Sequence, residues 1–200
     1  MAKIAIIGNG NVGGTLGKRW TEAGHEVVFG VRDPGQSTGS VNIASVEEAV
    51  AGSEIVVFAT PYSALAPLAA SLEVGARTLI DCTNPINADF SGLLPIATSA
   101  AEELAAATGS KKVVKAFNTI GFNIMENPNF NGHPATLLIC GDDQEAKKTV
   151  RQLAEDIGFA AEDAGPLLQA KWLESLAWLW ISMAAKFGYG RDIVFNLAKR

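Results

Sequence analysis

The chain has 200 residues, of which 48% are hydrophobic and 18% charged, and its formal net charge at pH 7 is −5. This length and composition predict one globular domain with an extension. A net negative charge without a dense basic stripe argues against a nucleic-acid partner. The longest apolar run near the carboxyl end is shorter than the ~20 residues of a membrane span, so we expect no membrane partner.

The cysteines and the amino terminus indicate the compartment. Cys82 and Cys140 are far apart and form no metal-ligand cluster, so we expect no metal site and a reducing environment. A strand predicted from residue 3 leaves no room for a signal peptide. We therefore expect a cytoplasmic protein.

Predicted strands and helices alternate along the chain. Short apolar runs predict strands at residues 3–7, 26–30, 54–59, 77–82, 112–116, 135–141 and 159–162. Helices are predicted between them, around residues 12–20, 46–51, 62–72, 96–108 and 144–157. This order predicts an α/β fold of the Rossmann type, a doubly wound, mostly parallel sheet with helices on both faces. Ligands of such sheets bind at the carboxyl ends of the strands.

The first predicted strand runs directly into a glycine-rich turn and a helix. The turn has the spacing G-x-G-x-x-G and comprises Gly8, Asn9, Gly10, Asn11, Val12 and Gly13. Gly8 permits the tight turn, Gly10 lets the backbone approach a diphosphate, and Gly13 lets the helix pack on the strand. Amide groups at the start of the helix would bind the diphosphate. The pattern therefore predicts a dinucleotide site.

Arg32 follows the second predicted strand, where an NAD site carries Asp or Glu. Its guanidinium would offer a 2′-phosphate a forked pair of charge-assisted hydrogen bonds. We therefore expect NADP(H) rather than NAD(H), with a solvated loop cation as the alternative. Asp33 comes next, but it precedes Pro34 and could shape the turn.

Small, polar and aromatic residues follow the third, fourth and fifth strands, at the edge where the nicotinamide half would lie. We assign positioning roles in catalysis to Lys115 and Asn118, with ordinary turn chemistry as the alternative for each segment. The residues assigned to the cofactor at these strand ends are Ala59, Thr60, Pro61, Thr83, Asn84, Pro85, Phe117 and Asn118.

Titratable groups are scarce in the predicted cleft. His25 is expected at the surface and His133 in a turn, and the sequence shows no Ser-His-Asp set and no H-E-x-x-H motif. Hydride transfer between two cofactor rings needs close, oriented rings more than it needs acid–base catalysis. The composition of the cleft therefore favours such a transfer.

The segment from Gly165 predicts a long helix that is apolar almost all round and carries Trp172, Trp178 and Trp180. One face can cover the sheet, and the other needs a second surface. Tryptophan is enriched in interface cores. We therefore expect residues 1–164 to form the NADP-binding domain and residues 165–200 a helical extension that makes a homodimer; burial within one monomer is the alternative.

The stretches "IIGNGNVGGTLGKRW", "ATPYSAL", "DCTNP", "KAFNTIG", "CGDD" and "GYGRD" together resemble the coenzyme F420-dependent NADP oxidoreductase family. The resemblance extends over nearly the whole chain. The stretch "KAFN" is also similar to the cytosolic NADPH–flavin domain of the six-transmembrane epithelial antigen metalloreductases.

The resemblance implies an oxidoreductase that transfers a hydride between NADPH and a second substrate, F420 or a flavin such as FAD or FMN. It places Asn9, Asn11 and Val12 at the diphosphate, Val31 and Arg32 at the 2′-phosphate, and Ala59, Pro61, Asn84 and Asn118 at the nicotinamide. The best-known deazaflavin enzymes have Ser-Arg where this chain has Val31-Arg32, and they lack "KAFN".

Two other functions fit the sequence. Lys171 resembles the helix lysine that serves as general acid in hydroxyacid dehydrogenases, so an imine or β-hydroxyacid reductase of small substrates is one alternative. A non-catalytic NADPH-sensing module is the other, because no single catalytic residue is indispensable for hydride transfer.

Overall fold

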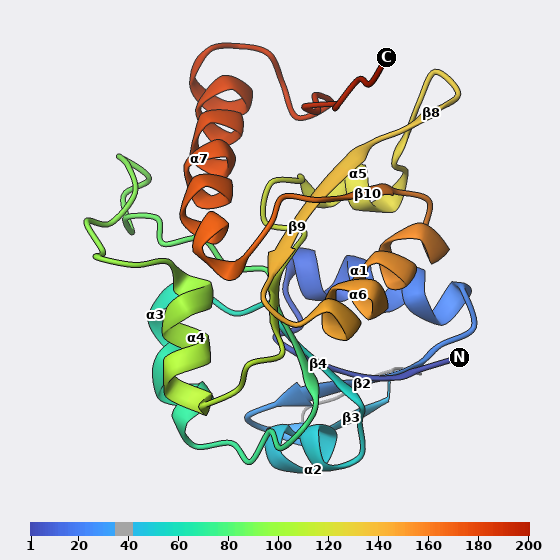
Figure 1. The fold of residues 1–200 in the computed structure, drawn as a ribbon, viewed down its shortest axis with the longest axis vertical. Helices are drawn as coiled ribbons and strands as arrows, with labels where there is room; N and C mark the ends of the chain where they lie inside the picture. Colours follow the sequence, from blue (N-terminus) through green and yellow to red (C-terminus); the bar gives the residue numbers. More distant parts are fainter. Residues whose placement is uncertain (35–41) are drawn as a thin grey trace.

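The computed structural model describes residues 1–34 and 42–200, which form a central sheet with helices on both faces (Figure 1). The sheet contains β1 (Lys3–Ile7), β2 (Glu26–Val31), β3 (Ile43–Ser45), β4 (Ile55–Phe58), β5 (Thr78–Asp81), β6 (Val113–Lys115), β9 (Thr136–Gly141) and β10 (Ala160–Asp163). The helices are α1 (Asn11–Glu22), α2 (Val46–Ala51), α3 (Tyr62–Ala70), α4 (Ala100–Thr108), α5 (Phe122–Glu126), α6 (Gln144–Asp156) and α7 (Ala170–Lys186).

The strand order across the sheet is β10-β9-β6-β5-β4-β1-β2-β3. From β6 to β3 all neighbours are parallel, whereas β9 pairs antiparallel with β6, with Val114 opposite Gly141. β10 then pairs parallel with β9. The predicted Rossmann-type, doubly wound and mostly parallel sheet is confirmed.

Each face of the sheet has its own hydrophobic core. Side chains of α1, α5 and α6 cover one face, where the fully buried Trp20 donates its indole N–H to the carbonyl of Leu153 at 2.9 Å. Side chains of α2, α3, α4 and the start of α7 cover the other face. The strands are apolar on both sides because both of their faces are buried.

Several boundaries and small elements differ from the sequence-based prediction. α4 begins at Ala100 rather than at residue 96, because Ser99 and Glu102 form a capping box that fixes the first turn there. The prediction did not include β3, α5 or the hairpin of β7 (Asn129–Phe130) and β8 (His133–Pro134). All of these are short: β3 has three residues, α5 five, and β7 and β8 two each, which is too few for a periodic sequence pattern.

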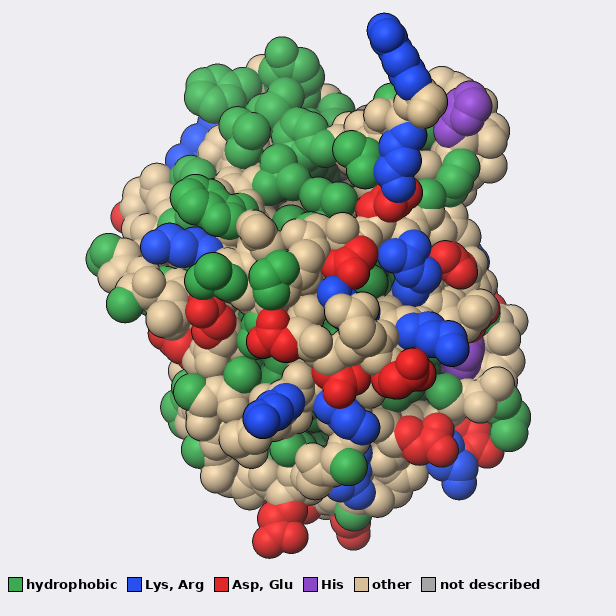
Figure 2. Space-filling view, in the orientation of Figure 1, with side chains coloured by type: hydrophobic (Ala, Val, Ile, Leu, Met, Phe, Trp, Pro, Cys, Tyr) green, Lys and Arg blue, Asp and Glu red, His purple; other side chains and the backbone are tan. Residues whose placement is uncertain are grey.

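The predicted long C-terminal helix is present as α7, preceded by the 3-10 turn η2 (Leu167–Gln169). Leu173 and Ala177 are buried, but Trp172 is 64% exposed and Leu179 is 49% exposed. The alternative that the whole helix is buried within one monomer is therefore wrong. Figure 2 shows hydrophobic side chains gathered over α7 and the segment that follows it.

One histidine also differs from expectation. His25 is half-buried instead of lying free at the surface, because its ring contacts the Ala2 amide through Nδ1 and Asp156 through Nε2, at 3.2 and 3.1 Å. His133 is exposed at the tip of the β7–β8 hairpin. Among the described residues, no helix is long and apolar enough to cross a membrane.

Candidate functional site

The glycine turn between β1 and α1 is shaped by close backbone contacts. Gly8 has a φ of +106°, and a Cβ there would lie 2.5 Å from the carbonyl oxygen of Ala59. A Cβ at Gly13 would overlap the carbonyl oxygen of Gly8, so no larger residue fits between helix and strand. A Cβ at Gly10 would meet no described atom within 4 Å. The space beside Gly10 is therefore open to a ligand.

The first turn of α1 faces this open space, and no side chain of the described residues caps its backbone donors. Gly10 is the N-cap and provides no side-chain acceptor, and the first turn contains no acidic residue. The first amides of a helix have no partner within the helix and carry the positive end of its dipole. A diphosphate fits these donors.

A cavity of about 810 Å³ lies on one side of the turn, and we call it the Arg32 pocket. The predicted residues that line it are Gly8, Val31, Arg32, Thr60 and Pro61. Arg32 and Asp33 are both exposed, but only Arg32 lines the cavity. The pocket thus joins the glycine turn to the residue expected to bind the 2′-phosphate.

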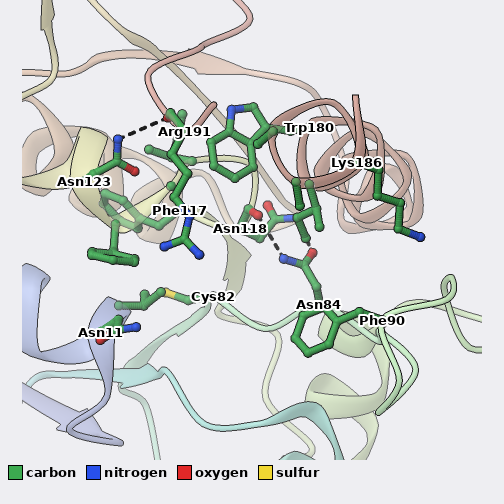
Figure 3. Close-up of a pocket in the computed structure, with 17 residues that line it drawn as sticks. Asn11, Cys82, Asn84, Phe90, Phe117, Asn118, Asn123, Trp180, Lys186 and Arg191 are labelled. Atoms are coloured by element: carbon green, nitrogen blue, oxygen red, sulfur yellow. Dashed lines mark hydrogen bonds between the residues drawn. The ribbon is translucent and has the colours of Figure 1, made fainter. Parts of the chain in front are cut away.

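A second cavity, of about 550 Å³, lies on the other side of the turn, and we call it the Trp180 pocket (Figure 3). α1 supplies Asn11 and Val12, and α7 closes the opposite side with Trp180. The predicted residues Asn84, Phe117 and Asn118 also line it. The structure therefore brings together residues from the ends of β1, β5 and β6.

Asn84 and Asn118 bind each other inside this pocket. Asn84 Nδ2 donates to the carbonyl of Asn118 at 2.9 Å, and Asn118 Nδ2 donates to Asn84 Oδ1 at 3.0 Å. The pair fixes both side chains across two strand ends (Figure 3).

Three buried polar atoms at adjacent strand ends have no hydrogen-bond partner within the described residues. They are Thr60 Oγ1 after β4, Thr83 Oγ1 after β5 and Asn118 Oδ1 after β6. Buried polar groups are normally satisfied, and exceptions at one edge of a sheet point to a missing polar ligand. Together with the open space at Gly10, these atoms fit a bound dinucleotide.

Phe117 adopts a left-handed backbone conformation, with φ of 62°. Its ring makes edge-to-face contacts with Trp20 and Phe159, with centroids 5.6 and 6.1 Å apart. Such a conformation costs a non-glycine residue about 1–3 kcal/mol and persists where packing enforces it. The strained turn directs the chain after β6 so that Asn118 lines the pocket.

Lys115 does not line the cleft, in contrast to the place expected for it beside the nicotinamide. It is fully buried and lines neither pocket, because its ammonium is bound by Asp81 and Glu174 below the strand ends. A positioning role for Lys115 therefore acts through other residues.

The remaining predicted residues surround the two pockets without lining them. Ala59 lies directly under Gly8, Thr83 and Pro85 are buried, and Asn9 lines a separate cavity beside α1. Their assignment to the cofactor stays a prediction.

Sequence reasoning missed most of the Trp180 pocket. The further lining residues include Phe90, Phe122, Asn123, Trp180, Lys186 and Arg191. The motif "GYGRD" contains Arg191 and was the one available signal. Figure 3 shows the Arg191 side chain extending into the cavity, whereas Lys186 points away from it.

Cys82 is a titratable side chain in the wall of this pocket, beside Asn11 (Figure 3). Burial, reinforced by the nearby Asp81 carboxylate, raises the pKa of its thiol far above the ordinary value. The thiol is therefore neutral at physiological pH and is a poor nucleophile.

The fold and these two pockets define a Rossmann-type dinucleotide-binding domain. Residues 3–85 match the family model described as NADP oxidoreductase, coenzyme F420-dependent. Over these residues the match confirms the resemblance drawn from the sequence motifs.

Individual relatives extend this match. The chain is 35% identical over 181 residues to rat Metalloreductase STEAP3. This match covers 87% of the chain and 36% of that protein. It is 34% identical over 96 residues to the F420-dependent NADP reductase of Methanocaldococcus jannaschii, covering 48% of the chain and 43% of that enzyme. The chain thus spans less than half the length of either relative.

A crystal structure of a proposed F420-dependent NADP reductase from Arthrobacter sp. FB24 superposes with a TM-score of 0.87 and 29% identity, and the match covers 100% of both chains. The matched family, the archaeal enzyme and this structure are all named as NADP reductases or oxidoreductases.

The expected role of Arg32 can be tested by its removal. Replacing Arg32→Ala should weaken NADPH binding by about 10- to 100-fold, because a charge-assisted hydrogen bond contributes roughly 1.5–3 kcal/mol. NADH affinity should change little, since NADH has no 2′-phosphate. Fluorescence titration with both cofactors measures the ratio of affinities.

Lys111→Ala provides the control, because Lys111 is an exposed cation that precedes β6 at the opposite edge of the sheet. An unchanged NADPH-to-NADH ratio in Arg32→Ala would show that Arg32 is only a solvated loop cation.

Proposed function

We propose that this protein transfers a hydride between NADPH and a deazaflavin or flavin bound in the Trp180 pocket, with F420, FMN and FAD as the candidate acceptors. The observation that carries the proposal is the composition of this pocket. Its polar end carries the Asn84–Asn118 pair, its sides are aromatic, and an arginine reaches into it.

The aromatic lining suits a flat ring system. Phe90, Phe122 and Trp180 contribute rings from three separate segments, and the volume of about 550 Å³ falls within the range of small-molecule sites. Gly121 makes the packing of Trp180 possible, because a Cβ there would lie 2.6 Å from the indole. Two planar rings could then approach each other between Asn118 and α7.

The charges of the pocket suit an anionic acceptor. Among the described residues that line it, none is Asp or Glu, and the cationic Arg191 extends into it, although the whole chain carries a net charge of −5. The Arg191 guanidinium lies 5.6 Å from the centre of the Phe122 ring. A phosphate on the acceptor's side chain would bind there by a charge-assisted hydrogen bond.

In this proposal each group of residues has one task. The glycine turn and the start of α1 bind the diphosphate, Arg32 binds the 2′-phosphate, and Asn118 orients the nicotinamide carboxamide. When bound, NADPH would supply the hydride, and the reduced acceptor ring would keep the negative charge or take a proton from solvent, so the protein would need no general acid. The apolar sides of the Trp180 pocket exclude water from the transfer.

The two alternatives have less support. Lys171 is exposed and lines neither pocket, so it is not placed as a proton donor for an imine or β-hydroxyacid reductase. A sensor that only binds NADPH would not need the aromatic acceptor side of the Trp180 pocket, opposite the Asn84–Asn118 pair.

The direct test is anaerobic loss of nicotinamide absorbance with purified protein and NADPH, alone and then with F420, FMN or FAD. We expect turnover with at least one of these acceptors and none without acceptor. Absence of turnover with all three, despite NADPH binding, would contradict the proposal and favour the sensor.

The position of Arg191 in the Trp180 pocket predicts how it affects the choice of acceptor. Arg191→Ala should lower kcat/KM for FMN about tenfold, which corresponds to one exposed charge-assisted hydrogen bond. Riboflavin lacks the phosphate, so its kcat/KM should stay unchanged; F420 and its phosphate-free core form the equivalent pair. Steady-state kinetics with each pair measure the difference.

Lys148→Ala is the matched control, since it removes an exposed cation of α6 that does not line the Trp180 pocket. Equal losses for FMN and riboflavin in Arg191→Ala would show that Arg191 supports the pocket without binding the phosphate.

We also propose that the exposed side of α7 forms a homodimer. Trp172 and Leu179 of α7, together with Leu168 before it and Phe187 and Tyr189 after it, are 49–68% exposed. Exposed apolar patches of this kind mark interaction surfaces.

Leu179→Glu should convert a dimer into monomers in sedimentation velocity, whereas Leu197→Glu, in the C-terminal segment, should not. A wild-type monomer at micromolar concentration would contradict the proposal.

A further inference from the structure

A buried ion cluster lies beneath the two pockets and has no part in the function proposed so far. Lys115, the last residue of β6, is fully buried. Its ammonium lies 2.8 Å from Asp81 Oδ2 and 2.7 Å from Glu174 Oε1, and it also donates to the carbonyl of Thr83. All three of its donor positions are thus used.

The partners of Lys115 come from segments far apart in sequence. Asp81 ends β5, Thr83 belongs to the loop after it, and Glu174 lies near the start of α7. Glu174 Oε1 also accepts the Ala100 amide at 2.9 Å, at the start of α4. One ammonium therefore connects β5, β6, α4 and α7.

The cluster holds the loop after β5 from both sides. The amide of Thr83 donates to Asp81 Oδ1 at 2.8 Å, while its carbonyl accepts from Lys115. Asn84 follows directly and makes the reciprocal pair with Asn118 in the Trp180 pocket. The position of this pair is thus fixed by the residue before it.

The same cluster also fixes the opposite side of the pocket. Glu174 and Trp180 lie on the same helix, and Trp180 and Ile181 line the pocket. A helix is rigid over such a short span, so binding Glu174 places the indole. The distance across the pocket, from Asn118 to Trp180, therefore depends on the Lys115–Glu174 contact.

Stability alone does not account for the cluster. Replacing a buried ion pair by apolar residues of similar volume is often neutral or stabilising. Here two carboxylates surround one ammonium, and burial raises the pKa of Glu174 above its ordinary value in spite of the nearby ammonium. What the ion pairs add to apolar packing is directional bonds between defined atoms.

We propose that Lys115, together with Glu174, is a positioning device that sets the spacing between the nicotinamide side and the acceptor side of the Trp180 pocket. Where it concerns the acceptor, this inference rests on the proposed function. The expected change in the position of the bound nicotinamide does not depend on that function.

Glu174→Met tests the link to α7. It leaves Lys115 paired with Asp81, so no unpaired charge is buried, whereas Lys115→Met leaves two carboxylates together and risks misfolding. We expect kcat to fall about 10- to 100-fold, since displacing reacting groups by about 1 Å has an effect of this size. The dissociation constant of NADPH should change much less, because the glycine turn and Arg32 are untouched. Stopped-flow kinetics and binding titrations separate the two quantities.

Glu174→Gln is the conservative variant, because its amide oxygen can still accept from Lys115 and from the Ala100 amide. It should recover most of the lost kcat. Lys147→Met is the matched control: Lys147 is a buried lysine that binds Asp163 at 2.7 Å and lines neither pocket. It should lower the melting temperature but leave kcat unchanged.

Wild-type kcat in Glu174→Met would overturn the proposal. It would also be overturned by an equal loss of kcat in Lys147→Met, or by a Glu174→Gln variant as slow as Glu174→Met, since loss of stability alone would then explain the effect.

The fluorescence of bound NADPH separates this inference from the proposed function. The nicotinamide should fluoresce more strongly in the wild-type protein than in water, and in Glu174→Met the emission should fall toward that of free NADPH while the affinity is retained. This comparison needs no acceptor, so it holds even if no deazaflavin or flavin is reduced. Equal emission from both proteins, or a wild type that does not bind NADPH, would overturn the proposal.

Discussion

The fully buried positive charge of Lys115 is the constraint on which the arrangement of this molecule depends. Moving an ammonium out of water costs several kcal/mol, and only nearby carboxylates and carbonyls offset that cost. Lys115 meets this demand with Asp81 from β5, Thr83 from the following loop and Glu174 from α7. The two carboxylates raise the pKa of Lys115, although burial alone would lower it, so the charge is retained. The helix α7 is thus bound to the ends of the strands rather than lying loosely over them.

The glycine turn between β1 and α1 is a second constraint on the structure, and it is steric rather than electrostatic. Gly8 and Gly13 have backbone carbonyl oxygens where a Cβ would be, so β1, α1 and the end of β4 meet at distances that side chains would prevent. The Arg32 pocket and the Trp180 pocket lie on the two sides of this turn. A dinucleotide laid over the turn would have its phosphate end in one pocket and its reactive ring in the other, which is how ligands lie at the strand ends of such sheets.

The helix α7 has apolar side chains on three sides, whereas an ordinary amphipathic helix has them on one. Leu173 and Ala177 pack on the core, Trp180 lines the pocket, and Trp172 and Leu179 are exposed. This explains why its sequence is apolar almost all round, with no polar stripe to mark the side that faces solvent. Among the charged residues of α7, Glu174 is the buried one, 2% exposed because Lys115 and the Ala100 amide bind it.

The sequence by itself determined the elements that depend on neighbouring residues. Apolar strands between turns predicted the layered sheet, and G-x-G-x-x-G predicted the turn at Gly8, because backbone conformation and close approach are set within a few residues. It also placed Arg32 and Asn118 at strand ends, where parallel strands bring their following loops together.

Only the tertiary structure decided where side chains point and which distant groups meet. Lys115 looked like a cleft residue because its partner Glu174 comes 59 positions later, and nothing local indicates that a lysine at a strand end is buried. Arg191 likewise enters the Trp180 pocket from the C-terminal segment, whose path depends on contacts such as the 2.7 Å hydrogen bond from the Trp180 indole to the carbonyl of Ile193. Local pattern fixes the backbone periodicity of each element, whereas the pairing of charges requires the whole chain to be folded.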